Sequence, residues 1–287
     1  MGLKKQVWTS QLMENFYPKT TFLSKVRDYS AFVDNDRIHI PSAGVDPKVL
    51  INNTTYPIKT IIREDYDNDI ELDVFSTENT KLRRPEDLEL SYNKLESVLS
   101  QHRNTLQVAV AKKAIHAFAP SADTKDTPVI KTTGAAKDER KRITFEDILT
   151  LKERFDDALI PLEERFLVLH PKHVNDLMLE DLQLFKDLTD LDNGEPRRFA
   201  GFGCYSFPYM PVYGSNLSKV AFSDDMSGNF ASVAFHAKEV MRADGSIYMY
   251  ARYDDPEERA TIVGFDKRFI AVPIRNKGIG AIVSAAV

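Results

Sequence analysis

The chain contains a single cysteine, Cys204, in 287 residues. One cysteine excludes an intrachain disulfide, which fits a reducing compartment or an assembly that does not depend on sulfur. Because Cys204 lies among Gly, Tyr and Phe residues, we interpret it as a small buried hydrophobic side chain rather than a nucleophile. Runs of about 18 consecutive apolar residues are also missing, so no transmembrane helix is expected.

Catalytic signatures are missing as well. The sequence has no G-x-S-x-G elbow, no Walker phosphate loop and no C-x-x-C pair, and Gly201 and Gly203 are not followed by the third glycine of a dinucleotide-binding loop. The formal net charge of −5 gives no electrostatic basis for tight, non-specific binding to nucleic acid. We therefore predict a non-enzymatic protein without a cofactor or a metal ion.

The first residues do not form a targeting signal. Met1 to Tyr17 mixes polar residues into its apolar ones, so it lacks the continuous apolar core of a signal peptide. Gln6 stands where the myristoylation pattern after Gly2 needs Ser or Thr. We expect a soluble protein that is made in the cytoplasm.

Two groups of potential metal ligands have simpler interpretations. His170 and His173 have H-x-x-H spacing, but no third ligand is close in the sequence and a polar turn uses histidine readily. Six acidic residues between Glu64 and Asp73 could hold Ca²⁺, but their spacing does not match an EF-hand. We interpret the histidines as structural and the acidic run as a solvated or partner-facing strand edge.

The most prominent feature that is present is a stretch from Pro85 to Ala119 without an internal proline or glycine. Proline suits the first helical position, and the acidic residues that follow it lie at the positive end of the helix dipole. Apolar residues recur at helical spacing: Leu88, Tyr92, Leu95, Leu99, Leu106 and Val110. The predicted helix is about 50 Å long, so it must be a spine for other elements or reach beyond its own domain.

Two extended segments precede this helix. Residues 1–33 are very apolar for a terminus, and such an arm must dock on its own domain or on a neighbouring copy. Residues 37–84 contain strand candidates at 37–41, 56–62 and 70–74 around a loop rich in Pro and Asn. A long hairpin of this kind is marginal by itself in water, so it needs a partner surface.

A smaller α+β unit is predicted after the helix. The polar stretch 120–142, which ends in a mixed charge run, is expected to be a solvated loop. Thr144 and Asp147 have the spacing of a capping box before a helix whose apolar set is Phe145, Ile148, Leu149, Leu151, Phe155 and Leu159. Further elements are a buried strand at 165–169, a helix from Pro171 to Leu182, and strands at 199–207, 231–235, 246–250 and 260–272.

This order of elements resembles the major capsid proteins of tailed bacteriophages, which have the Hong Kong ninety-seven fold. The resemblance rests on Val7-Trp8-Thr-Ser-Gln-Leu12 with Phe16-Tyr17, on Asp36 to Phe75, on the helix 85–119, on Phe166 to Pro171 with the helix that follows, on Ala200-Gly-Phe202 and its strand, and on 260–272. It implies an α+β fold divided into an N-terminal arm (1–36), an extended β-hairpin loop (37–84), a peripheral domain with the spine helix (85–135), an axial domain (136–258) and returning strands (259–287).

The resemblance also implies a function. It predicts a subunit that assembles as hexamers and pentamers into an icosahedral or elongated shell around double-stranded DNA, without sequence-specific binding, in a virion assembled in the bacterial cytoplasm. Expected partners are a portal and, since only six residues precede Val7, a separate scaffolding protein. No membrane partner is expected. The predicted subunit-interface residues are Trp8, Leu12, Phe16, Tyr17, Val45, Val49, Leu50, Tyr56 and His102.

Several alternatives stay open at this point. An encapsulin-type nanocompartment shell protein would share the fold. An enzyme with an unrecognised site around the H-x-x-H pair and the acidic strand belongs to another class. Some members of the resembled family crosslink Lys to Asn between subunits; Lys48 and Lys59 are candidates, but no partner Asn is marked, so crosslinking is not predicted. His102 could face a neighbouring subunit or the shell interior.

Overall fold

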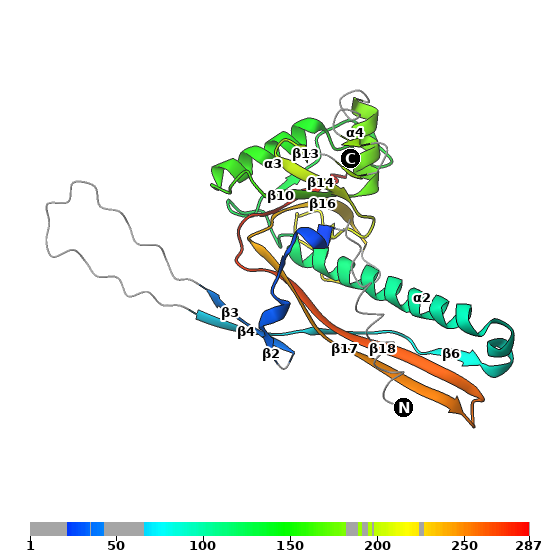
Figure 1. Cartoon of the computed structure of the whole chain (residues 1–287). Coiled ribbons are helices and arrows are strands. Elements are labelled where there is room, and N and C mark those ends of the chain that lie inside the picture. The colour runs from blue at the N-terminus through cyan, green and yellow to red at the C-terminus, as the bar shows by residue number, and fades with distance from the viewer. Residues whose placement is uncertain are drawn as a thin grey trace, which may run out of the picture.

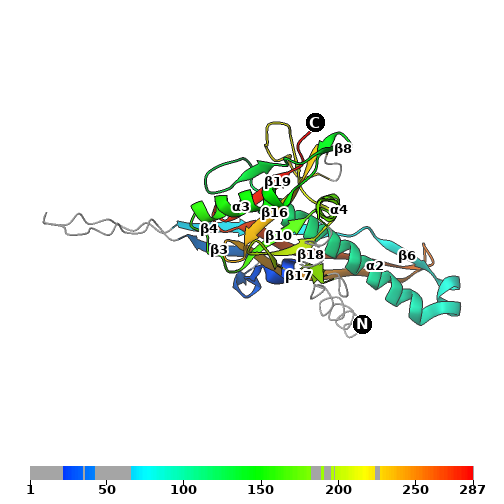
Figure 2. The ribbon, with the colours of Figure 1, turned by 90° about the horizontal axis from the view of Figure 1, so that it is seen from above.

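The computed structural model describes residues 22–34, 36–42, 66–181, 189–190, 195–196, 198–223 and 227–286. These residues form two units set at an angle to one another (Figure 1). The elongated unit consists of helix α2 lying along the long strands β17 and β18. The compact unit is a sheet covered by helices α3 and α4, and in the view from above it sits across one end of α2 (Figure 2).

Helix α2 spans Arg84–Phe118, 35 residues, and confirms the predicted spine helix. Its predicted apolar stripe is buried at Leu99, Leu106 and Val110, where the structure describes the side chains. These side chains share one hydrophobic core with Phe265 and Phe269 of β18. Pro120 follows the helix closely and cannot continue it, because proline has no N–H to donate.

The elongated sheet is built on two long antiparallel strands, β17 (Val240–Asp255) and β18 (Ala260–Pro273). β5 (Asp73–Ser76) and β6 (Thr80–Arg83) pair with successive parts of β18, and β1 (Arg27–Asp28) runs parallel to the start of β17. The strand predicted at 260–272 is confirmed, and that at 246–250 is the middle of a longer strand.

The single strand predicted at 70–74 is wrong. β4 (Tyr66–Glu71) belongs to a hairpin with β3 (Arg37–Ser42), whereas β5 pairs with β18. The chain changes sheet at Leu72, whose side chain is buried beside Ile38 and Met241. β3 confirms the strand predicted at 37–41, and the strand predicted at 56–62 lies outside the described residues.

The described part of the N-terminal arm docks on its own chain. It contains η1 (Phe22–Lys25), η2 (Ser30–Phe32) and β2 (Val33–Asp34), and β2 extends the β3–β4 hairpin to three strands. Phe22, Leu23 and Val26 are buried in the same core as α2. Of the two alternatives left open by the sequence, docking within the chain therefore holds for this part of the arm.

The compact unit is a seven-stranded sheet with the order β13-β14-β10-β16-β19-β7, in which β15 also pairs with β16. The strands are β7 (Val129–Lys131), β10 (Arg165–Leu169), β13 (Arg198–Phe199), β14 (Phe202–Ser206), β15 (Val212–Tyr213), β16 (Asn229–His236) and β19 (Ile279–Val283). Strand β10 is buried on both faces: Leu167 and Leu169 pack under α3 (Phe145–Asp157) and α4 (Pro171–Glu180), and Val168 joins the core of α2.

Three predictions for the compact unit need correction: the strand at 199–207, the apolar face of α3 and the solvated loop at 120–142. The strand predicted at 199–207 is a hairpin, because Ala200 and Gly201 both have positive φ and form the two-residue turn between Phe199 and Phe202. Leu149 and Leu159 are exposed rather than part of the apolar face of α3, and Leu159 lies after the helix end with a φ of 56°.

The stretch 120–142 is not simply a solvated loop. It contributes β7 to the sheet and contains the two-stranded hairpin β8 (Ala136–Lys137) and β9 (Arg140–Lys141). A second small hairpin joins β11 (Thr189–Asp190) and β12 (Glu195–Pro196).

In the described part of the chain, the backbone crosses between the two units three times, after α2, after β16 and after β18, and polar contacts hold the last two crossings together. His236 N donates to Gly278 O (2.9 Å), and Ile274 N donates to Glu239 O (2.8 Å). The guanidinium of Arg275 binds both carboxylate oxygens of Glu239, at 2.8 and 2.7 Å. The β16–β17 crossing at Ala237–Glu239 therefore lies directly beside the β18–β19 crossing at Ile274–Gly278.

Candidate assembly surfaces

The elongated sheet is covered by α2 on one face only. Along β17, Ile247, Met249 and Ala251 point into the core shared with α2. The alternate residues Tyr248 and Tyr250 point the other way and are 50% and 59% exposed. Tyrosine combines a large apolar ring with a polar tip and is enriched in protein interfaces. This half-exposed tyrosine face is therefore a candidate contact surface.

The outer edge of β17 is a second candidate. β18 pairs with β17 along its length, but on the other edge β1 reaches only Met241 and Arg242. In the described part of the chain, no strand pairs with that edge beyond Arg242. An unpaired edge offers N–H and C=O groups to another strand, which makes it a site for β-sheet extension.

An ion-pair cluster holds the base of the β3–β4 hairpin against these long strands. Asp36 binds the Ser246 hydroxyl (2.9 Å) and the Arg268 guanidinium (3.0 Å). Asp244 contacts the ammonium group of Lys267, which is buried, and burial lowers the pKa of Lys267 to about 8. These side-chain contacts therefore fix the direction in which the base of the hairpin leaves the elongated unit.

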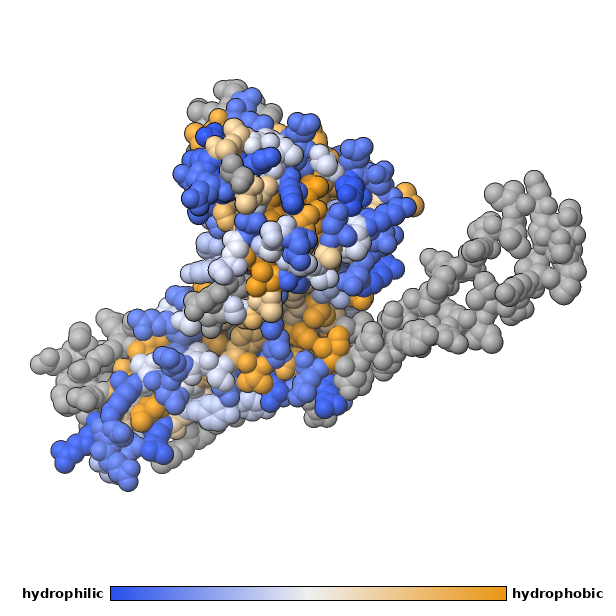
Figure 3. Space-filling model, turned by 180° about the vertical axis from the view of Figure 1, so that it is seen from behind, coloured by the Kyte–Doolittle hydropathy of each residue, from blue (hydrophilic) through white to orange (hydrophobic). Residues whose placement is uncertain are grey.

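Hydrophobic residues gather near the junction of the two units, as the rear view shows (Figure 3). A separate small hydrophobic cluster lies at the base of the β3–β4 hairpin, with partly buried Ile70, Val272 and Ile274 around buried Leu72. Phe32 and Val74, in segments next to this cluster, are 66% and 51% exposed. Exposed apolar groups of this kind mark interaction sites when they lie together.

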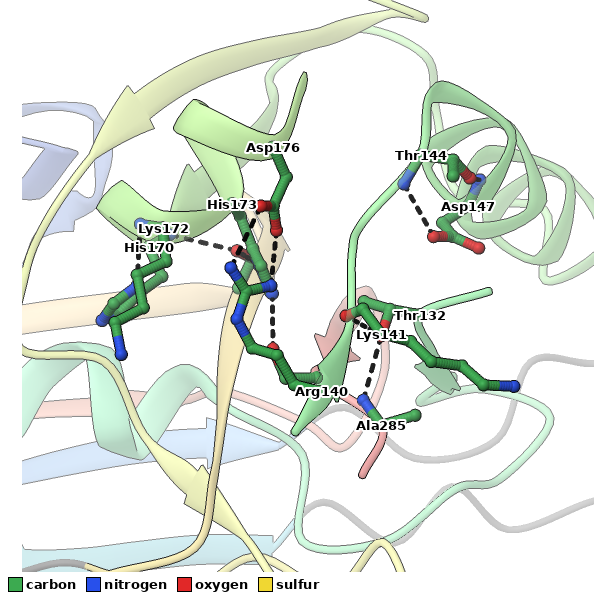
Figure 4. A network of polar contacts seen from close by, with 12 residues as sticks. Thr132, Arg140, Lys141, Thr144, Asp147, His170, Lys172, His173, Asp176 and Ala285 are labelled. Atoms are coloured by element: carbon green, nitrogen blue, oxygen red, sulfur yellow. Dashed lines mark hydrogen bonds and ion pairs between the residues drawn. The ribbon is translucent and has the colours of Figure 1, made fainter. Parts of the chain in front are cut away.

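A buried polar network fixes the β8–β9 hairpin to α4 (Figure 4). Arg140 binds Asp176 through two contacts of 2.5 and 3.0 Å, and the Asp176 side chain has no exposed surface. The Arg140 guanidinium also lies 5.3 Å from the Phe230 ring centroid. Nearby, Thr132 Oγ1 donates to Lys141 O and accepts from Ala285 N, both at 2.9 Å.

The H-x-x-H pair belongs to the same network and is structural. His173 is fully buried, with Nδ1 2.6 Å from Ser232 Oγ and Nε2 2.9 Å from Ser284 Oγ. His170 caps α4, because its Nδ1 accepts from Lys172 N, and it stacks on Phe230. Burial lowers the pKa of His173 to about 3 and that of His170 to about 4. Among the described residues, no three potential ligands come together as a metal site.

The other chemically notable residues also have structural roles. Cys204 is buried, and burial raises the pKa of its thiol to about 11, so the thiol is a hydrophobic group and a poor nucleophile.

Within the described helices, none is both long and apolar enough to cross a membrane.

Of the predicted interface residues, only His102 lies in the described part of the chain. Trp8, Leu12, Phe16, Tyr17, Val45, Val49, Leu50 and Tyr56 fall outside it. His102 is buried on α2, with Nε2 3.0 Å from Thr80 Oγ1 and its ring 5.2 Å from that of Phe265. These contacts are all within its own chain. His102 also lines a surface pocket between α2 and the end of β5.

Sequence reasoning missed the tyrosine face and the buried ion pairs. Tyr248 and Tyr250 do alternate with apolar residues in the sequence, which is a detectable signal. Arg140 and Asp176 are 36 residues apart, and Asp244 and Lys267 belong to different strands, so those pairs follow only from the tertiary structure.

No protein-family model matches the chain, and no curated protein matches it in sequence. Solved structures match over nearly its whole length. The capsid of cyanophage P-SCSP1u has a TM-score of 0.67 at 13% identity, covering 93% of this chain and 89% of that chain. The capsid of Ralstonia phage GP4 has a TM-score of 0.66 at 10% identity, with coverages of 96% and 91%.

The acid-stable capsid of Helicobacter pylori bacteriophage KHP30 has a TM-score of 0.62 at 12% identity, covering 94% of this chain and 92% of that chain. The chain therefore has the fold of these phage capsid proteins, which confirms the predicted resemblance at the level of the fold.

Proposed function

We propose that this chain is the major capsid protein of a tailed phage, which self-assembles into the icosahedral or elongated head shell around double-stranded DNA. The observation that carries the proposal is the likeness to phage capsid chains, which extends over 93% of this chain for cyanophage P-SCSP1u and over 96% for Ralstonia phage GP4. An accessory fragment would match only part of such a subunit. The tyrosine face and the unpaired β17 edge support the proposal, because a second copy could cover both.

The parts of the subunit have distinct roles in this proposal. The elongated unit is the peripheral domain with α2 as its spine, and the compact unit is the axial domain. Residues 1–36 are the N-terminal arm and 37–84 the extended loop, and both contact neighbouring subunits through Trp8, Leu12, Phe16, Tyr17, Val45, Val49, Leu50 and Tyr56. The subunits form hexamers and pentamers, with a portal and a separate scaffolding protein as partners, and the product is a virion capsid assembled in the host cytoplasm.

Expression of the full chain, with and without the proteins encoded beside its gene, tests the proposal. Closed shells in negative-stain images and a fast-sedimenting species are the expected result. A monodisperse monomer under all conditions would argue strongly against a shell subunit. Genes for a terminase and a portal beside this gene would identify a phage head, whereas a neighbouring cargo enzyme would identify an encapsulin-type compartment.

A further inference from the structure

A pocket of about 380 Å³ opens on the flank of α2, in the elongated unit. One wall is α2, through Gln101, His102, Thr105 and Leu106; the other is the end of β5 and its link to β6, through Phe75 and Glu78. Figure 1 shows α2 and β6 running side by side, and in the described part of the chain β5 and β6 form an edge of the elongated sheet, because each pairs only with β18. Because the pocket lies on this edge, a second copy of the chain beside it can reach the pocket.

The floor and the rim of the pocket differ in chemistry. His102 and Leu106 are buried at the floor, and the histidine is already engaged with Thr80. Glu78, Gln101 and Thr105 are exposed at the rim. In the described part of the chain, none of these three rim side chains makes a hydrogen bond or an ion pair. The rim therefore offers a carboxylate, an amide and a hydroxyl that a visiting group can bind.

The charges of the residues that line the pocket indicate which kind of side chain can bind there. Among the described residues that line it, Glu78 is the only charged one, and none is a lysine or an arginine. Burial lowers the pKa of His102, so its imidazole is neutral near pH 7 and adds no positive charge. A negatively charged rim above a partly apolar floor suits a side chain with a long methylene stem and a cationic head.

We propose that this pocket receives a lysine or arginine side chain from a second copy of the chain, with its cationic head on Glu78 and its stem against Leu106 and the His102 ring. The proposal rests on the proposed function, because a closed shell places copies side by side. In this arrangement His102 lies next to the interface between copies, while its hydrogen bond with Thr80 stays within its own chain.

Filling the pocket tests this inference. Thr105→Trp places a large ring in the pocket, whereas Asn104→Trp places the same ring on the neighbouring exposed position of α2, which does not line it. We expect both variants to have the circular dichroism spectrum of the wild type. Asn104→Trp should assemble as the wild type does, and Thr105→Trp should need at least about a tenfold higher subunit concentration for half-assembly.

The charge is tested by Glu78→Gln, which keeps the shape of the side chain and does not depend on how Thr105→Trp folds. This variant should raise the half-assembly concentration about threefold or more and weaken the salt dependence of assembly. Wild-type assembly by Glu78→Gln, with the wild-type salt dependence, would overturn the proposal even if Thr105→Trp were impaired. A wild-type chain that never assembles would refute the proposed function, and the pocket proposal with it.

Discussion

Arg140 connects the β8–β9 hairpin to helix α4 through Asp176, and the carboxylate has no exposed surface. Removing the carboxylate leaves a largely buried guanidinium without its partner, which typically costs about 3–5 kcal/mol. We therefore expect Asp176→Ala to lower the free energy of unfolding of the free subunit by about that amount, as measured by urea denaturation.

A matched control is Lys238→Ala, because the Lys238–Glu164 pair is 3.5 Å apart and both side chains are 50% exposed. Exposed pairs contribute at most about 1 kcal/mol, so this variant should be close to the wild type. Equal losses in the two variants would contradict the importance of burial at Asp176.

His173 makes the stability of the compact unit depend on pH. Burial, with the nearby His170 and Arg140, lowers its pKa from 6.5 to about 3. Above about pH 6.5 the residue is neutral in both states, so this contribution to stability is fully present. As the pH falls from 6.5 toward 3, the unfolded chain binds a proton that the folded chain excludes, and stability falls by up to about 1.4 kcal/mol per pH unit.

The measurement is the unfolding free energy of the free subunit between about pH 7 and pH 4.5, for the wild type and for His173→Gln. Glutamine does not titrate, so the variant should lose stability less steeply as the pH falls, whatever its stability at pH 7. His170 and the other histidines remain and retain part of the slope. Parallel pH profiles for the two proteins would show that His173 is not the titrating group.

At the scale of elements, helix α3 shows a predicted capping box. Thr144 Oγ1 accepts from Asp147 N (3.2 Å), and Asp147 Oδ2 accepts from Thr144 N (2.9 Å). Loss of the cap in Thr144→Ala should destabilise the subunit by about 1 kcal/mol in thermal or urea denaturation.

Asp147→Ala should be more destabilising, because Asp147 Oδ1 also accepts from the Thr133 hydroxyl at 2.7 Å and so holds the segment before the helix. The reverse order of the two effects would indicate that the Thr133 contact contributes little. The ranking separates the capping role from the tertiary one, since only Asp147 has both.

Local patterns in the sequence were sufficient for elements whose signals are local. The 35-residue helix has no internal glycine and no proline after its first turn, β10 is apolar from Phe166 onward, and the capping box has fixed spacing. Predictions were wrong where pairing partners decide the structure. Ile70 to Val74 reads as one strand, but its two ends belong to different sheets. The sequence predicts that the charge run at 137–142 is solvated. In the structure, Arg140 is largely buried and forms an ion pair with the carboxylate of Asp176, which lies on a distant helix.

At the scale of the whole molecule, the two sheets stabilise each other, but parts of the periphery have no partner among the described residues. The core of α2 extends into the compact unit through Phe235 and Val168, so the angle between the units is fixed by packing. The tyrosine face and the β17 edge, in contrast, have no partner in the described chain. A molecule with a rigid body and uncovered margins is suited to repeat itself at fixed angles, which a closed shell requires.

The extended loop is expected to serve assembly and not folding. Residues 44–54 lie outside the described residues, and the anchoring contacts of the hairpin base, such as Asp36 with Arg268 and buried Leu72 in its cluster, lie outside this deletion. A deletion of 44–54 should therefore leave the unfolding free energy of the free subunit within about 1 kcal/mol of the wild type, because no described core residue is removed. The same deletion should prevent stable shells from forming.

Sedimentation velocity and electron microscopy on the deletion variant separate these outcomes. A folded subunit that stays small would identify the loop as a clamp between subunits. Shells of normal stability would show that the loop is not required, and the contacts that close the shell would then have to come from the body, through the tyrosine face, the β17 edge and the pocket beside His102. A variant that fails to fold would show that residues 44–54 are needed for folding. That result would contradict the expectation that the hairpin base folds without them.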